Sequence, residues 1–228
     1  MQMLSKSLIF EQNDIEFVTA HELDQYLANG WRHFGSHFFR YNLSIHKEEV
    51  CRVFPLRIKL ENYKHRSSFK KIIKKNRHFT YQVQPLNITK EKIALFENHR
   101  SKFKENSPQS IYDFISPNPN IPIRPLEVCV YDEAKLIACS FLDIGSKATS
   151  SIYGMFDLEY ADFSLGIYTM LLEIEYSQKE GIDYYYHGYC YDIKSFYDYK
   201  KRFPATEWFD WQGNWITLKA DGLFNKLA

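Results

Sequence analysis

Tyrosines and basic residues crowd together between Tyr184 and Phe203, in the stretch YYYHGYCYDIKSFYDYKKRF. A tyrosine offers a flat apolar ring and a polar hydroxyl, which suits a partly wet groove. Cations beside stacked rings are typical of sites for a ligand that carries both bases and phosphates. The alternative interpretation is an ordinary tyrosine-rich edge of a β-sheet, because aromatic residues are common in strands.

A second candidate binding feature is a lysine-rich segment in the first half of the chain. No acidic residue occurs between Glu61 and Glu91, and SSFKKIIKKN within this interval predicts a short helix over 67–76. Ser67 or Ser68 would cap this helix, and its apolar residues would be buried: Phe69, Ile72 and Ile73. The opposite face then carries four lysines: Lys70, Lys71, Lys74 and Lys75. It is either a solvated surface or a surface that binds a polyanion, and the missing acidic residues favour the polyanion.

Bulk properties indicate a globular protein. The chain has 228 residues, of which 45% are hydrophobic and 25% charged, and this length suits one large domain or two small ones. The cysteines are separated in sequence and form no CxxC motif, which argues against a structural zinc or iron–sulfur site: Cys51, Cys129, Cys139 and Cys190. No signal peptide or membrane span is predicted, so we expect a cytoplasmic protein with reduced thiols.

The predicted secondary structure is of mixed type. A helix is expected at about 89–104, followed by a proline-rich loop and then an antiparallel hairpin formed by LEVCVYD and AKLIACSFLDIG. Next we expect a strand in SSIYGMFD, a helix over 164–180 capped by Ser164 and ended by Gly181, and a strand in IDYYYHGY. A short helix in SFYDYKKRF and a closing strand or hairpin in EWFDWQGNWITL complete the chain.

This order of elements predicts an α+β protein whose mixed central sheet is flanked by helices. It is also the order found in the second half of acetyltransferase-like (GNAT) enzymes, in which the acyl donor lies at a helix N-terminus that attracts phosphate. We expect two regions, namely residues 1–85 with the basic helix, and an acetyltransferase-like domain over residues 86–228.

The segment from Ser150 to Pro204 resembles the C-terminal domain of arginyl-tRNA–protein transferases and their bacterial leucyl-transferase relatives. The residues that fit the family pattern without a gap are Ser150-Ser151, Tyr153, Asp157, Ser164-Leu165-Gly166, Glu173-Ile174-Glu175, Gly188-Tyr189, Tyr199-Lys200 and Pro204. Upstream, GWRHFGSHFFRY and CRVFPLRIKLENYKHRSSFKKIIKKNR are also similar to family elements, so that the resemblance covers roughly residues 28–205.

Several positions depart from the family pattern. Members commonly carry several N-terminal cysteines that form a metal or cluster site, whereas only Cys51 is present in that region here. His33 replaces an arginine, Leu158 replaces a proline, and Ser195-Phe196-Tyr197 stands where a Pro-Lys-Met-type element is usual. These departures put cluster-based regulation and the donor and acceptor preference in doubt.

The resemblance implies transfer of an amino acid, arginine or leucine, from charged tRNA to the N-terminal α-amine of a protein or peptide. The amine would attack an ester that is already activated, so positioning, an oxyanion donor and a route for the amine proton suffice. No cofactor or metal is implied. The expected partners are charged tRNA and an acceptor N-terminus, with no membrane involved.

The resemblance also implies roles for individual residues. Asp157 would orient or deprotonate the amine, with Tyr189 as the second catalytic residue. The donor would be bound by Tyr153, Ser164, Leu165, Gly166, Lys200 and the four lysines of the basic helix, and an acidic acceptor by Arg32 and Arg40. Each residue also has a purely structural interpretation: a capping aspartate, an N-terminal helix cap, packed tyrosines, a solvated lysine and internal ion pairs.

Two other function classes stay open. An acetyl-CoA-dependent N-acetyltransferase would normally show Arg/Gln-x-x-Gly-x-Gly/Ala before its helix, whereas DFSLGIY at residues 162–168 has one glycine and no such basic residue. A non-catalytic relative that binds tRNA or a degron is the third possibility, and the presence of Asp157, Gly166 and Tyr189 argues against it.

Overall fold

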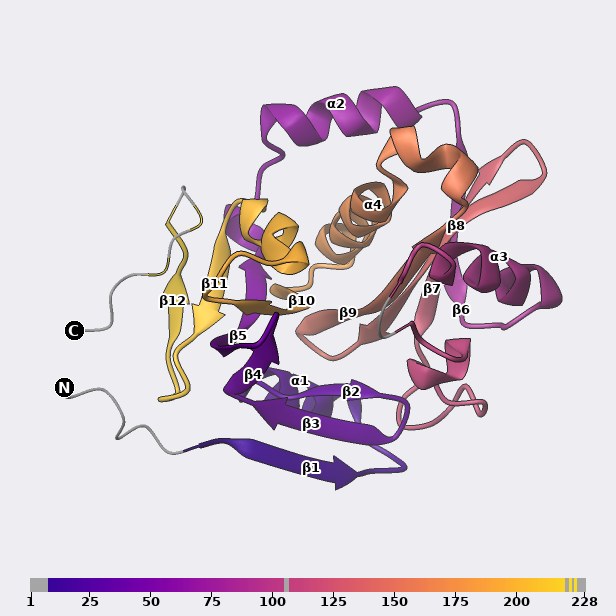
Figure 1. Ribbon diagram of the computed structural model, residues 1–228. Helices are drawn as coiled ribbons and strands as arrows, with labels where there is room; N and C mark the ends of the chain where they lie inside the picture. Colours follow the sequence, from indigo (N-terminus) through magenta and orange to yellow (C-terminus); the bar gives the residue numbers. More distant parts are fainter. Residues whose placement is uncertain (1–7, 105–106, 220–221, 223, 225–228) are drawn as a thin grey trace.

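A mixed β-sheet with helices on both faces forms the centre of the protein (Figure 1). The computed structural model describes residues 8–104, 107–219, 222 and 224. Within them the large sheet has nine strands in the order β12-β11-β5-β10-β9-β8-β7-β6, with β4 paired to β5, and a second sheet has the order β1-β3-β2. The predicted α+β class and mixed central sheet are confirmed.

The strands have the following bounds: β1 Phe10–Asp14, β2 Arg32–Phe34, β3 His37–Tyr41, β4 Leu43–His46, β5 Glu49–Lys59, β6 Thr80–Pro85, β7 Leu126–Asp132, β8 Lys135–Ile144, β9 Ala148–Phe156, β10 Tyr184–Tyr191, β11 Thr206–Phe209 and β12 Trp215–Thr217. The α-helices are α1 Ala20–Ala28, α2 Ser67–Asn76, α3 Lys90–Arg100 and α4 Leu165–Lys179. Four 3-10 helices are described: η1 Leu60–Asn62, η2 Ile111–Asp113, η3 Leu158–Phe163 and η4 Phe196–Arg202.

The alternation of side chains along β7 divides the core into two layers. Val128 and Val130 pack with Leu165 and Tyr168 of α4, whereas Cys129 of the same strand packs in the cluster that contains α3. Helices α4 and α3 therefore cover opposite faces of the sheet. Because the faces of β7 and β8 are both covered, their sequences read as nearly continuous apolar runs.

The neighbouring strands β9 and β10 are parallel, and they are paired over only three residues. Tyr184–Tyr186 pair with Ala148–Ser150, and no pairing between the two strands is recorded beyond that point. The register of β10 against β5 shifts between Tyr186 and Gly188, and Gly188 has φ +94°. A bulge bends a strand, and here it lies where β10 leaves β9. The result is an opening between two strands in the middle of the sheet.

The local predictions agree closely with the structure. The hairpin is formed by β7 and β8, the long helix spans Leu165–Lys179 with Gly181 at φ +71° behind it, and the basic helix spans Ser67–Asn76. The predicted capping of the basic helix by Ser67 or Ser68 is wrong, because both lie inside the helix and its N-cap residue is Arg66, which makes no side-chain capping hydrogen bond. The closing segment is the antiparallel hairpin of β11 and β12. Ser164 occupies the N-cap position of α4 as predicted, but its side chain makes no capping hydrogen bond, and its backbone has φ +55°.

The tyrosine-rich strand differs from both interpretations of its sequence. β10 is an inner strand between β5 and β9, not an edge strand. Its side chains Tyr185, Tyr186, Tyr189 and Tyr191 are buried, so these rings pack in the interior. Aromatic residues in this strand thus fill core space on both faces.

The region before residue 86 contributes strands to the same sheet as the region after it. β5 lies between β10 and β11, and β6 pairs with β7. The division after residue 85 stays a prediction, and it falls between two strands of one sheet. None of the described helices is both long enough and apolar enough to span a membrane.

Candidate active site

Two cations lie at the opening between β9 and β10, one bound to each strand. The Arg32 guanidinium, from β2, donates to the Ser150 hydroxyl at 2.5 Å and to the Ser151 carbonyl of β9. The Lys200 ammonium, from η4, donates to the Tyr189 carbonyl of β10 at 3.2 Å. These carbonyls belong to the parts of β9 and β10 that no longer pair with each other, and the side chains satisfy groups that a continuous ladder would have used.

The Lys200 amine is enclosed on several sides. It lies 4.8 Å from the centre of the Tyr197 ring, and a Cβ atom at residue 188 would come within 2.7 Å of it. Glycine at position 188 therefore makes room for the amine and also permits the positive φ of the bulge. Burial, reinforced by the charge of Arg32 and opposed by Cys190, lowers the pKa of Lys200 to about 7.

A buried carboxyl group from α4 faces Arg32. Glu173 has 0% exposure, and Tyr185 donates its hydroxyl to Oε2 at 2.5 Å. Burial raises the pKa of Glu173 to about 7, against the opposing hydrogen bonds of Ser140, Tyr185 and Ser151 and the charge of Arg32. Burial likewise lowers the pKa of Arg32, while its carboxylate neighbours act in the other direction.

His187 lies at the bulge itself and is buried. Its ring is stacked near Tyr185, with centroids 6.1 Å apart, and is tilted against Phe203, with centroids 5.7 Å apart. Burial and then the charges of Lys200 and Arg32 lower the pKa of His187 to about 3. Burial thus keeps the His187 imidazole neutral near the two basic side chains.

Next to Arg32, the side chain of His33 turns to a different partner. Its Nε2 atom lies 2.9 Å from Asp143 Oδ2 of β8, and both side chains are buried. The charge of the Asp143 carboxylate also acts on Arg32, where it opposes the lowering of the Arg32 pKa by burial. The histidine that departs from the family pattern therefore has a buried acidic partner.

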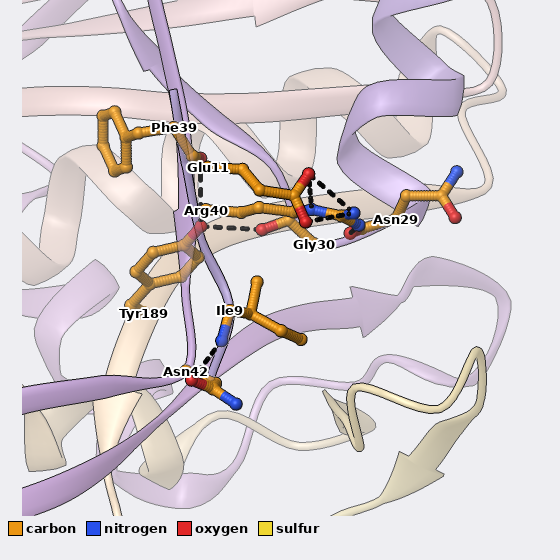
Figure 2. A network of polar contacts seen from close by, with 8 residues as sticks. All are labelled: Ile9, Glu11, Asn29, Gly30, Phe39, Arg40, Asn42 and Tyr189. Atoms are coloured by element: carbon orange, nitrogen blue, oxygen red, sulfur yellow. Dashed lines mark hydrogen bonds and ion pairs between the residues drawn. The ribbon is translucent and has the colours of Figure 1, made fainter. Parts of the chain in front are cut away.

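Tyr189 joins the opening to the small sheet (Figure 2). Its hydroxyl donates to the Gly30 carbonyl at 2.7 Å and lies 3.3 Å from the Phe39 carbonyl. Arg40 lies in the same network, where it pairs with Glu11 at 2.9 Å and donates to the Asn29 carbonyl at 3.1 Å. The structure thus brings Arg32, Tyr189 and Lys200 to the opening, and Arg40, paired with Glu11, belongs to the network around the Tyr189 hydroxyl.

Asp157 and Tyr153 contact other parts of the molecule. Asp157 follows the last residue of β9, accepts a hydrogen bond from the Glu159 amide at 3.0 Å and pairs with Lys135 at 2.8 Å. The Tyr153 ring stacks on Phe114 with centroids 3.8 Å apart, and burial raises the pKa of its phenol. These contacts match the capping and packing interpretations, and the catalytic role of Asp157 and the binding role of Tyr153 stay predictions.

The predicted donor-binding turn, Ser164-Leu165-Gly166, begins α4. The C-terminal end of α2 packs beside it: Asn76 donates to the Phe163 carbonyl at 3.0 Å and Lys75 to the Asp162 carbonyl at 2.8 Å. All four lysines of the helix are exposed, and Lys75 differs from Lys70, Lys71 and Lys74 in having this structural hydrogen bond. The basic helix and the start of α4 are neighbours in space.

The polar interior of the opening was largely missed by sequence reasoning. The sequence motif includes Glu173 but predicts no role for it, and nothing in the sequence around Tyr185 and His187 predicts their contacts. One signal was present, because a glutamate within the apolar run TMLLEI lies where a helix buries its side chains. A buried ionisable residue of this kind is a candidate for function.

Strand pairing brings two of the cysteines together, which their separation in sequence did not indicate. Cys129 and Cys139 lie opposite each other in β7 and β8, with sulfur atoms 3.7 Å apart. Together with Glu127 they form a trio whose ligand atoms lie within 4.8 Å of one another. Glu127 is already paired with Lys92 at 2.6 Å, so we interpret the trio as a structural contact, and the absence of a required metal stays a prediction.

Comparison with known proteins agrees with the resemblance seen in the sequence. The chain is 26% identical over 207 residues to the aspartate/glutamate leucyltransferase of Campylobacter jejuni strain RM1221, covering 86% of this chain and 83% of that one. It is 27% identical over 157 residues to arginyl-tRNA–protein transferase 1 of Saccharomyces cerevisiae, covering 56% and 31%. A crystal structure of FemX covers 83% of the chain and 65% of its own, with a TM-score of 0.47 and 12% identity.

The family model described as the C terminus of arginine-tRNA-protein transferase matches residues 91–210. This interval contains β7 to β10, α4 and η4, and therefore both strands of the opening together with the helix that carries Glu173 and the turn that carries Lys200. Because the match extends over just over half of the 228 residues, the chain belongs to the arginine-tRNA-protein transferase family.

Proposed function

We propose that the protein transfers an amino acid, arginine or leucine, from charged tRNA to the N-terminal α-amine of an acceptor protein or peptide. Family membership supports this reaction, as do the printed names of relatives that are leucyl- and arginyltransferases. The observation that carries it is the opening between β9 and β10, where the Arg32 guanidinium and the Lys200 amine bind backbone carbonyls of the two strands that have parted. An ester carbonyl that gains negative charge during aminolysis is stabilised by such donors.

The arrangement of helices supports a path for the tRNA. The exposed lysines of α2 lie beside the start of α4, and phosphates bind both to lysine side chains and to helix N-termini. In this proposal the terminal nucleotide meets Ser164, Leu165 and Gly166, and the preceding backbone follows α2. The parting of two parallel strands beside this helix also supports an acetyltransferase-like (GNAT) arrangement, and the tRNA substrate supports a cytoplasmic location.

The other predicted residues would take part in this reaction only after changes in their present contacts or from the edge of the opening. Tyr153 would contact the donor from the α3 side of the sheet, and Asp157 would act at the end of β9 once its contact with Lys135 is exchanged. Arg40 would have to leave Glu11 to bind an acidic acceptor residue.

A transfer assay tests the function. Radiolabelled leucyl-tRNA and arginyl-tRNA are each incubated with the protein and with peptides that begin with Asp, Glu or Ala. We expect label on a peptide only when the amino acid arrives on tRNA and the peptide has a free α-amine. Label from free amino acid, or from acetyl-CoA supplied in a parallel reaction, would replace this proposal with a different transferase activity.

A further inference from the structure

Lys200 lies at the opening between β9 and β10 and, among the described residues, makes no ion pair, unlike its sequence neighbour Lys201. Within the described part of the chain it lies within ion-pair distance of no carboxylate, whereas the next residue, Lys201, pairs with Asp198 at 2.9 Å. Among the described residues its amine donates a hydrogen bond only to the Tyr189 carbonyl, over 3.2 Å. A lysine that only balances charge would be expected to have an acidic neighbour.

The groups that face Lys200 disfavour its protonated form. Arg32 approaches from β2, and His187, Tyr189 and Cys190 come from β10, while Tyr197 comes from η4 itself. Burial is the largest cause of the lowered pKa, Arg32 adds to it, and Cys190 opposes it. With a pKa of about 7, a substantial share of the amine is a free base at neutral pH.

The position of the Lys200 amine also suits a proton acceptor. The amine lies on the β10 side of the opening, and the donors of Arg32 that could bind an ester oxygen lie on the β9 side. A substrate between the strands would meet a cation on one side and a free amine on the other. Asp157, the alternative base, is already bound to the Lys135 ammonium and to the Glu159 amide.

We propose that Lys200 is the proton acceptor of the transfer reaction, taking a proton from the α-ammonium group of the acceptor. This inference rests on the proposed function and assigns a step within it. The proton passes from the acceptor nitrogen to the Lys200 amine, and the freed nitrogen lone pair then attacks the carbonyl carbon of the aminoacyl ester. The new C–N bond replaces the C–O bond to the ribose, the ribose oxygen receives the second proton of the nitrogen, and Lys200 returns its proton to water.

Arginine substitution separates this role from that of a simple cation. Lys200→Arg keeps the charge but cannot accept a proton near neutral pH, because a guanidinium has a pKa above about 12. We expect kcat/KM at pH 7 to fall at least 100-fold, within the range that general base catalysis supplies, and to rise as pH increases from 6 to 8.5 because the acceptor amine deprotonates by itself. A residue that only holds a phosphate would tolerate arginine.

The matched control is Lys201→Arg, on the same 3-10 helix, which should keep the rate of the parent. Lys200→Arg within threefold of the parent, with an unchanged pH profile, would overturn the assignment of Lys200 while leaving the transferase function intact. If the parent transfers no amino acid from either charged tRNA, the proposed function fails, and the assignment fails with it.

A direct titration covers the case in which the arginine variant does not fold. Lysine labelled with ¹³C at Cε in the parent protein reports the protonation of each amine by NMR. We expect one resonance, assigned to Lys200 by its loss in Lys200→Met, to titrate near pH 7, well below the ordinary lysine value of about 10.4. A midpoint above about 9.5 would contradict the proposal, because the amine would then be protonated at working pH.

Discussion

At the scale of residues, the opening is distinguished by ionisable side chains whose pKa values lie close to neutral pH. Glu173 and Lys200 both have pKa values near 7, one raised and one lowered by burial, and Arg32 lies near both. Burying ionisable groups lowers the stability of a protein. Such groups are nevertheless common at functional sites, where they exchange protons. Glu173 therefore gives a measurable test of the environment.

We predict that Glu173→Gln changes the pH dependence of stability. The folded carboxyl group keeps its proton up to about pH 7, whereas the unfolded one releases it near 4.5. The folded state thus binds more protons between these values, and this group's stabilising contribution, present below the lower pKa, is lost as pH rises through the higher one. The parent should lose about 3 kcal/mol of unfolding free energy relative to the variant between pH 5 and pH 8.

Urea unfolding at several pH values measures this difference. Glu175→Gln is the matched control, because Glu175 lies two residues further along α4, is 44% exposed and pairs with Lys179 on the surface. Its effect on the free energy of unfolding should be small, because exposed ion pairs contribute only about 0–1 kcal/mol. A difference for Glu173→Gln that does not vary with pH would mean that water reaches the carboxyl group in solution.

At the scale of elements, α2 has two distinct parts. One part packs on the rest of the protein: Lys75 donates a hydrogen bond to the Asp162 carbonyl, and the Phe69 side chain is buried. The other part is the exposed surface formed by Lys70, Lys71 and Lys74. A surface of this kind can be neutralised without disturbing the packing below it.

We predict that replacing Lys70, Lys71 and Lys74 together by Gln weakens tRNA binding and makes its salt dependence shallower by about two units, since each phosphate contact contributes slightly less than one. Binding to one tRNA at several salt concentrations measures the slope. Lys179→Gln, at the far end of α4, should leave the slope unchanged. An unchanged slope in the triple variant would remove the exposed lysines of α2 from the tRNA path.

Elements whose signals are local were predictable from sequence. The β7–β8 hairpin has a tight turn, α4 has a clear start and a terminal Gly181, and α2 has an apolar stripe. Contacts that join distant segments were not predictable, because nothing near Arg32 indicates a bond to Ser150, and nothing near Tyr189 indicates one to Gly30. The candidate site consists almost entirely of such contacts, so sequence indicated some of its members but not their arrangement.

At the scale of the whole molecule, the two halves of the sequence share one sheet. β5 supplies Leu56 and Ile58, both fully buried, and it pairs with β10 on one side and β11 on the other. Removal of this strand would leave two unpaired edges and an open core.

We predict that a fragment of residues 86–228 does not fold by itself. Without β5, the backbone groups of β10 and β11 lose their partners, and the apolar cluster that Ile58 shares with Tyr185 and Leu171 is exposed. Circular dichroism with urea titration should give no cooperative unfolding transition for the fragment, while the full chain gives one. A cooperative transition in the fragment would support a domain division at residue 85.

The place of β5 also constrains the order in which the protein can form. Residues 49–59 emerge from the ribosome well before residues 184–209, yet they become an inner strand only when both later strands have arrived. Closing such long loops is entropically costly and slows folding. Until the later strands pair with it, β5 exposes its apolar side chains to solvent. The burial of β5 thus depends on the last part of the chain, and we expect the opening between β9 and β10 to form among the final steps of folding.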